Sequence, residues 1–178
     1  MLLITVDDTE FFDAQKQEFV YIKRQTLSLE HSLVSLAKWE AKWHKPFLSQ
    51  EPKTEEELID YIRCMTITQN VNPLVYAGLT DAHFKMIQNY MDDPMTATTI
   101  NHRNKSHRRE IVTAEVIYYW MIALNIPFEC QKWHLNRLLT LVDVVSLKNN
   151  PEKMSKNEIL RSNRELNAAR RKRLHTKG

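Results

Sequence analysis

The chain has 178 residues, which is typical of one domain with or without an appendage, and only two of them are glycines, Gly78 and Gly178. This composition excludes glycine-rich phosphate-binding loops and favours helices over sandwiches or barrels, which need many tight turns. The two cysteines, Cys64 and Cys130, belong to no CxxC pair and lie in apolar helical patterns, so we expect buried free thiols.

The net charge of +3 is unevenly distributed. Residues 148–178 contain 10 Lys or Arg against 3 Asp or Glu, a net charge of +7, and the rest of the chain has 15 against 19, a net charge of −4. The opening "MLLITVDDTEFF" lacks the basic start of a signal peptide, and no apolar run approaches the roughly 20 residues of a membrane span. We expect a soluble protein of a reducing compartment, with a mildly acidic body and a basic tail.

Two β-prone stretches begin the chain: "LLITV" at residues 2–6 and "EFVYIK" at residues 18–23. They predict an antiparallel hairpin whose loop is the polar "DDTEFFDAQKQ" between them. A single hairpin is marginally stable, so this one must pack on the rest of the chain.

A first helix is expected to begin with Ser28 as its cap and to end near Lys45, because Pro46 disfavours a helix before it. Its apolar stripe consists of Leu29, Leu33, Leu36, Ala37 and Trp43.

The next two helices have clearer signals. Thr54 and Glu57 form a capping box at the start of the second helix, and Thr80 or Asp81 caps a third, which ends before Pro94. Their apolar faces are Leu58, Ile62 and Met65 in the second helix and Phe84, Ile87 and Met91 in the third.

Residues 95–107 have no hydrophobic period and predict an exposed loop, after which Ser106 caps a strongly apolar helix. Pro127 separates this helix from another at residues 133–145, which stops before Pro151. The stripe of the helix after Ser106 is Ile111, Ala114, Ile117, Tyr118, Met121 and Ile122.

Ser155 and Glu158 form a second capping box that predicts a last helix with a thin apolar stripe and a solvated basic end. The predicted fold is therefore mainly α: a compact bundle of about six helices with a small N-terminal β-hairpin and a basic C-terminal helix and tail. We divide it into a core domain, residues 1–150, and a C-terminal appendage, residues 151–178.

The stretch from Tyr118 to Asp143 combines five aromatic residues with polar ones and could indicate an active site. Cys130 and His134 share a helical face, but a nucleophile also needs an oxyanion site and a positioned base, and a zinc site needs two further ligands. Nothing in the sequence supplies either set. We therefore expect no catalytic centre, no metal and no cofactor.

Glu115 and Arg137 are charged residues in the two strongly apolar helices on either side of Pro127. Because a buried charge needs a partner, we expect these two side chains to form a partly buried ion pair across a helical hairpin.

The candidate partner-binding residues lie in two places. Trp43 continues the core stripe of the first helix, whereas Trp39 lies at its edge near Phe47. A tryptophan at such an edge is often a lid of the core, but tryptophans are also frequent at protein interfaces. The basic loop at residues 101–109 could contact phosphate. The basic run in the tail, which could bind a partner or nucleic acid, is Arg170, Arg171, Lys172 and Arg173.

Three stretches, "LEHSLVSLAKWEAKWHKPFL", "EIVTAEVIYYWMIALNIPFECQKWHLNRLLTLV" and "EKMSKNEILRSNRELNAARRKRLHTKG", resemble a family encoded in long-tailed phages of actinobacteria, the tail assembly chaperones. The resemblance covers nearly the whole chain. It implies a non-catalytic protein that coats the tape measure protein until tail tube subunits polymerise around it.

The resemblance further implies several copies per client, possible contact with the tail tube protein, a location in the cytoplasm of the infected bacterium and absence from the mature virion. The alternatives are a structural head–tail or tail component of the virion, a nucleic-acid-binding protein acting through its loop and tail, and an enzyme. Steeply salt-dependent DNA affinity would indicate the nucleic-acid-binding protein.

Overall fold

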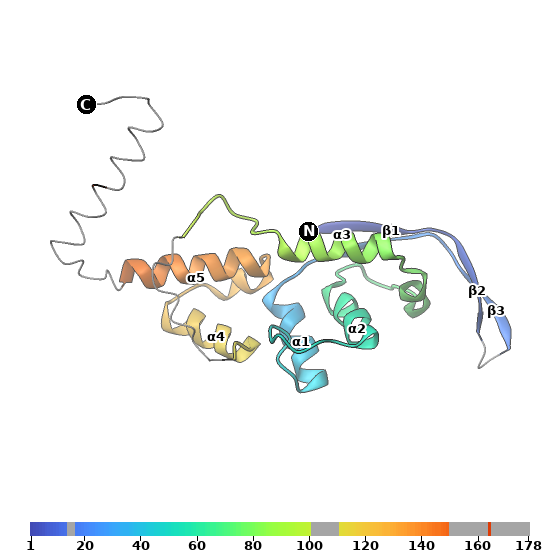
Figure 1. Cartoon of the computed structure of the whole chain (residues 1–178), viewed down its shortest axis with the longest axis horizontal. Coiled ribbons are helices and arrows are strands. Elements are labelled where there is room, and N and C mark those ends of the chain that lie inside the picture. Colours follow the sequence, from blue (N-terminus) through green and yellow to red (C-terminus); the bar gives the residue numbers. More distant parts are fainter. Residues whose placement is uncertain (14–16, 101–110, 150–163, 165–178) are drawn as a thin grey trace, which may run out of the picture. The chain divides into compact units, whose positions relative to one another are not determined.

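The computed structural model describes residues 1–13, 17–100 and 111–149 together with Arg164 (Figure 1). The chain divides into two units, Met1–Val145 and Ser146–Gly178, so the boundary falls within the last long helix, α5 (Leu135–Asn149). The sequence-based division at residue 150 places this boundary after α5 instead. Nearly all described residues belong to the first unit, to which the following account refers.

The N-terminal segment is an antiparallel ribbon of two successive ladders. The outer ladder pairs β1 (Leu2–Val6) with β4 (Gln25–Leu29), and the inner ladder pairs β2 (Thr9–Asp13) with β3 (Glu18–Ile22). An N-terminal hairpin was expected, but its predicted pairing is wrong, because "LLITV" pairs with "QTLSL" and not with "EFVYIK". The stretch "DDTEFFDAQKQ", which was predicted to be a polar loop, contains β2. Because β2 pairs with β3, the hairpin continues into this stretch.

The outer ladder has one buried face and one exposed face, as the alternation of side chains along a strand requires. Leu3 in β1 is 56% exposed on the opposite face. The buried side chains are Ile4 and Val6 from β1 and Leu27 and Leu29 from β4.

Helix α1 (Leu33–Trp43) begins later than the sequence predicted. Its N-cap is Ser32, whose hydroxyl accepts a hydrogen bond from the amide of Ser35, while Ser28 lies in β4. The helix ends at His44, which adopts a left-handed conformation with φ 53° and donates its amide to the carbonyl of Glu40.

Helix α2 (Glu55–Met65) begins where the sequence predicted, and helix α3 (Asp81–Asp92) has both of its predicted limits. Thr54 and Glu57 form the expected capping box of α2, and the amide of Thr80 donates to Nδ1 of His83 at the start of α3. Between them lies a short 3₁₀ helix, η1 (Pro73–Gly78).

Helix α4 (Ala114–Ala123) begins after Thr113, and Ile111 lies outside it with 61% of its surface exposed. A second 3₁₀ helix, η2 (Phe128–Lys132), connects α4 to α5. The predicted cap Ser106, the capping box at Ser155 and the basic run at residues 170–173 lie outside the described residues. Among the described helices, none combines the length and the apolar character needed to cross a membrane.

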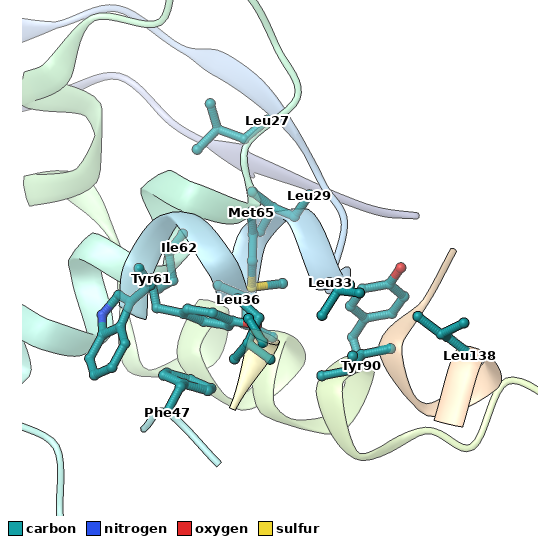
Figure 2. Close-up of a cluster of buried hydrophobic side chains, with 14 of the residues drawn as sticks. Leu27, Leu29, Leu33, Leu36, Phe47, Tyr61, Ile62, Met65, Tyr90 and Leu138 are labelled. Carbon is teal, nitrogen blue, oxygen red and sulfur yellow. The ribbon is translucent and has the colours of Figure 1, made fainter. Parts of the chain in front are cut away.

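The core is built jointly by the ribbon and the helices, as Figure 2 shows for side chains of β4, α1 and α2. The segment after α2 also bonds to the end of β4: the amide of Glu30 donates to the carbonyl of Met65, and that of Ile67 to the carbonyl of Ser28. The described residues thus form a largely helical fold with a small antiparallel sheet at its N-terminus, which agrees with the expected fold in its coarse outline.

Candidate binding groove between helices α2 and α3

An open hollow of about 270 Å³ lies between α2 and α3. Its lining is mainly apolar, with only Lys85 and Gln88 contributing polar side chains. The lining residues are Phe47 from the α1–α2 connection, Leu58, Tyr61 and Ile62 from α2, and Phe84, Lys85, Ile87, Gln88 and Met91 from α3. We call this hollow the α2/α3 groove.

The groove lies where the predicted apolar faces of α2 and α3 meet, and neither face fully covers the other. Leu58 is 41% exposed, whereas Ile62, one helical turn further along, is 3% exposed. On the other wall, Ile87 is buried while Phe84 and Met91 are half-buried. Such a partly open apolar surface with a few polar groups at its rim is typical of a site that binds an apolar ligand or helix.

Phe47 forms part of the floor of the groove. Its ring stacks on that of Tyr61 with 3.7 Å between ring centroids (Figure 2), and it contacts the ring of Trp39 edge to face with 4.9 Å between centroids. Of the three aromatic residues predicted to bind a partner, only Phe47 reaches the groove.

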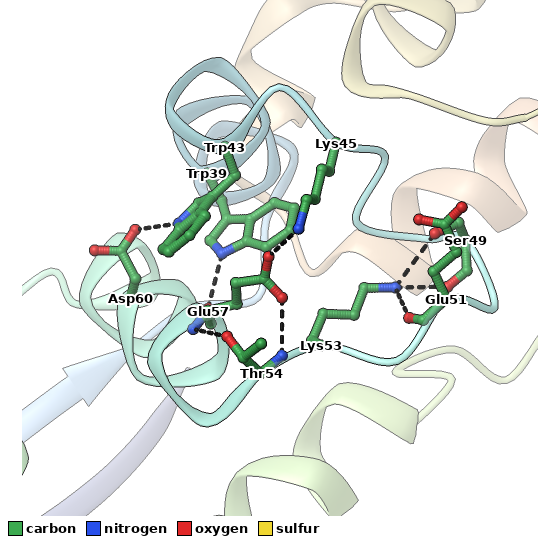
Figure 3. A network of polar contacts seen from close by, with 9 residues as sticks. All are labelled: Trp39, Trp43, Lys45, Ser49, Glu51, Lys53, Thr54, Glu57 and Asp60. Carbon is green, nitrogen blue, oxygen red and sulfur yellow. Dashed lines mark hydrogen bonds and ion pairs between the residues drawn. The ribbon is translucent and has the colours of Figure 1, made fainter.

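The predicted roles of Trp39 and Trp43 are reversed. Trp39 is fully buried and its indole N–H donates to the carbonyl of Glu57 at 2.8 Å, whereas Trp43 is half-buried and donates to Oδ2 of Asp60 at 2.9 Å (Figure 3). The prediction failed because it began the helical stripe at Leu29, which belongs to β4. Counted from Leu33, the stripe runs through Leu36 to Trp39 at intervals of three residues.

A polar network holds the connection between α1 and α2, which is the segment that contains Phe47 (Figure 3). Lys45 Nζ lies 2.6 Å from Oε1 of Glu57, and this hydrogen bond, together with the one from the amide of Thr54, holds the pKa of the Glu57 carboxyl below its usual value. Lys53 donates to the carbonyl of Ser49 at 2.6 Å, and its ammonium lies 5.7 Å from the Phe47 ring centroid. The network also places a cation beside the groove floor.

Asp60 of α2 accepts hydrogen bonds from Lys42 and Trp43 at the end of α1. Burial raises the pKa of its carboxyl, but hydrogen bonds from Lys42 and Trp43 outweigh burial and leave the pKa below its usual value. Asp60 therefore remains charged and joins the end of α1 to α2.

Glu40 is a buried carboxylate that the sequence analysis did not identify. Oε1 accepts a hydrogen bond from the amide of Phe47 at 2.9 Å, and Oε2 accepts one from the amide of Ala114, the first residue of α4, at 2.7 Å. Burial raises the pKa of Glu40, and the two amide donors partly oppose this rise. A carboxylate at a helix N-terminus is electrostatically favourable, so Glu40 joins α1 to both the groove floor and α4. The sequence signal that could have identified Glu40 as a buried residue was its position next to Trp39 on the apolar side of α1.

The predicted Glu115–Arg137 ion pair is wrong. Both side chains are exposed, and within residues 111–149 no ion pair joins them. Glu115 lies in the first turn of α4, where a negative charge is favoured, and the Arg137 guanidinium lies 4.2 Å from the ring centroid of Trp133. Each charge thus has a separate local environment and needs no buried partner.

Cys130 and His134 do not share a helix, because Cys130 lies in η2 and His134 precedes α5. His134 donates from Nε2 to the carbonyl of Tyr90 at 2.9 Å, and its Nδ1 accepts the amide of Asn136. No hydrogen bond joins the thiol to the imidazole in the described chain. Burial raises the pKa of the Cys130 thiol and so favours its unreactive protonated form. Both cysteines are free, although Cys64 is half-buried and not buried as expected.

His31 lies in the core beside His134, with 5.2 Å between ring centroids, and its Nδ1 is 2.6 Å from the hydroxyl oxygen of Tyr61. Burial lowers the pKa of His31 to about 4, with a further contribution from His134. The His31 ring is therefore neutral near pH 7. Its hydrogen bond with Tyr61 joins the end of the ribbon to the residue that stacks on Phe47 in the groove floor.

We expect acid to destabilise the fold through His31. The folded-state pKa of about 4 lies below the ordinary value of 6.5, so the unfolded chain takes up a proton that the folded chain refuses. The stability contributed by the neutral ring is complete above pH 6.5 and is lost as the pH falls towards 4, by up to about 3 kcal/mol. Urea denaturation at a series of pH values measures this loss.

The control for the acid experiment compares two histidines. His31→Asn should lose less stability than the wild type between pH 6.5 and 4, whereas His44→Asn, which changes an exposed histidine, should lose as much as the wild type. Equal acid-range losses for wild type and His31→Asn would contradict the assignment to His31.

Among the described residues, no three His, Cys, Asp or Glu side chains are grouped so that they could hold a metal ion. No protein-family model matches the chain, and no curated protein and no solved structure gives a significant match.

Proposed function

We propose that this chain is a tail assembly chaperone of a long-tailed phage, and that the α2/α3 groove holds an amphipathic helix of the tape measure protein. The observation that carries the proposal is the open apolar groove, together with the family resemblance of the sequence. In this role the protein acts by binding and not by catalysis.

The groove has the character required for a helical client. An amphipathic helix binds by placing side chains at positions i, i+3, i+4 and i+7 into an apolar channel, and the groove offers apolar walls from two helices. A tape measure protein exposes long apolar helical faces before the tail tube encloses it, and such faces aggregate when they are left uncovered. Lys85 and Gln88 at the rim keep the empty groove partly polar.

Reversible binding also fits the small area of the groove. Each copy covers a short helical segment, so many copies are needed along one tape measure chain, and each is released when tail tube subunits replace it. The protein then acts in the cytoplasm of the infected bacterium and is left out of the mature virion. The basic tail adds attraction to acidic stretches of the client, which salt weakens.

The test of the groove uses an exposed residue, so that the fold is retained. Leu58→Ser should weaken binding to the tape measure protein about tenfold, because it removes an apolar anchor from one wall. Ile122→Ser is the matched control, since Ile122 is an aliphatic residue of α4 with 62% exposure that does not line the groove. Co-expression, pull-down and calorimetric titration of the purified pair measure the effect.

Equal affinity of the wild type and Leu58→Ser, with unchanged circular dichroism, would contradict the groove as the client site. Mass spectrometry of purified virions tests the wider role, because a structural virion component is retained there and a chaperone is absent.

A further inference from the structure

The inner ladder of the ribbon carries exposed aromatic side chains on one face. Cross-strand pairing places Phe12 opposite Phe19 and Glu10 opposite Tyr21, and alternation along the strands puts all four residues on the same face. Phe12 is 53% exposed, Phe19 69% and Tyr21 57%. We call these four residues on β2 and β3 the aromatic arm; in Figure 1 the strands run away from the helices.

The aromatic arm does not serve the core of its own chain. The rings of Phe12 and Phe19 contact each other edge to face with 5.3 Å between centroids, and their remaining surfaces are open. Among the side chains of the inner ladder that the structure describes, the buried one is Ile22, on the opposite face. Contiguous exposed aromatic residues on a soluble domain are typical of an interaction site.

The charge around the arm is opposite to that around the α2/α3 groove. Residues 7–24 contain five Asp or Glu and three Lys or Arg, a formal charge of −2, and Arg24 pairs with Asp7 and bonds to Asp8. The remaining acidic residues, Glu10, Asp13 and Glu18, lie in β2 and β3 themselves. The groove has Lys85 in its lining and the Lys53 ammonium above the ring of Phe47 at its floor. An acidic aromatic surface and an apolar groove bordered by lysines are complementary in charge and in apolar character.

We propose that the aromatic arm of one copy of this chain inserts Phe12 and Phe19 into the α2/α3 groove of a second copy, with Glu10 facing Lys85. The sizes agree: a cavity of about 150 Å³ holds one benzene ring, so the hollow of about 270 Å³ has room for one or two phenyl groups. The contact joins two different surfaces and is therefore heterologous, so it leaves a free groove at one end of an open chain of copies and a free arm at the other.

The self-association requires no client and is tested on the purified chain alone. Where it concerns the client, the inference rests on the proposed function: the arm covers the groove of a neighbouring copy until a tape measure helix displaces it. The two proposals therefore fail separately, since a monomeric protein could still bind a client in its groove.

The first experiment is sedimentation velocity of the full chain over a range of protein concentrations. The wild type should associate, the double variant Phe12→Ser/Phe19→Ser should remain monomeric, and Leu58→Ser should associate about tenfold more weakly. Tyr119→Ser is the control for a lost exposed aromatic residue, because Tyr119 is 66% exposed on α4 and should associate as the wild type does. A wild type that is monomeric at every concentration would overturn the proposal, and so would undiminished association of the arm variant.

A charge exchange then tests the direction of the contact. Glu10→Lys and Lys85→Glu should each weaken self-association, and a mixture of the two single variants should associate more strongly than either alone, because the lysine arm of one variant meets the glutamate groove of the other. A mixture no stronger than its components would show that Glu10 and Lys85 do not face each other and would overturn the proposed geometry.

Discussion

Replacing Trp39 by alanine is expected to lower the free energy of unfolding by about 3–5 kcal/mol. The side chain is fully buried, its ring packs against Phe47 and Tyr61, and its N–H has a bond to the carbonyl of Glu57 that alanine cannot replace. Urea denaturation followed by circular dichroism measures the loss. The sequence alone led to the opposite expectation, in which Trp43 belonged to the core stripe and Trp39 lay at its edge.

Trp43→Ala is the matched control, because the second indole is half-buried and bonds to Asp60 at the edge of α2. We expect a loss of about 1–2 kcal/mol for this variant. If Trp43→Ala lost as much stability as Trp39→Ala, the assignment of Trp39 to the core and Trp43 to its rim would be wrong.

The second large effect is expected at Glu40. Glu40→Ala leaves the amides of Phe47 and Ala114 without their acceptors, and each buried unsatisfied donor costs about 1–3 kcal/mol, so the free energy of unfolding should fall by about 2–5 kcal/mol. Hydrogen exchange should also accelerate at these two amides, because both lose protection together.

Glu40→Gln tests the two hydrogen bonds to the amides of Phe47 and Ala114 separately, because it can keep only one of them. Glutamine keeps one acceptor oxygen and turns an amino group towards the other amide, so we expect a loss smaller than that of alanine but still measurable. A glutamine variant as stable as the wild type, with unchanged exchange at both amides, would mean that Glu40 does not join α1 to the groove floor and α4.

Local signals in the sequence were sufficient for α2 and α3. The capping box at Thr54 and the proline at position 94 act within a few residues of the helix ends, so no tertiary information was needed. The ribbon required more, because the pairing of β1 with β4 depends on which of two β-prone stretches supplies the better buried face. That choice is made by packing against the rest of the core, including the contact of β1 with α3, which a local pattern does not contain.

The groove illustrates a different limit. Hydrophobic periodicity correctly grouped Leu58 with Ile62 and Phe84 with Ile87, but it indicates only which side chains share a helix face. Whether a face is covered depends on the spacing of the helices, which leaves Leu58 partly open and Ile62 closed. The Glu115–Arg137 prediction failed for the same reason: apolar neighbours in the sequence do not show on which side of a helix a charged residue lies.

The bonds at the end of β4 have a consequence for synthesis on the ribosome. The strand end pairs with the segment after α2, and the carbonyl of His31 accepts the amide of Leu135 at 2.7 Å. The ribbon is translated before the segment after α2 and well before Leu135, so it lacks the last of these partners until Leu135 has left the exit tunnel. The first unit therefore completes its fold late in synthesis, because these bonds join residues that are distant in sequence.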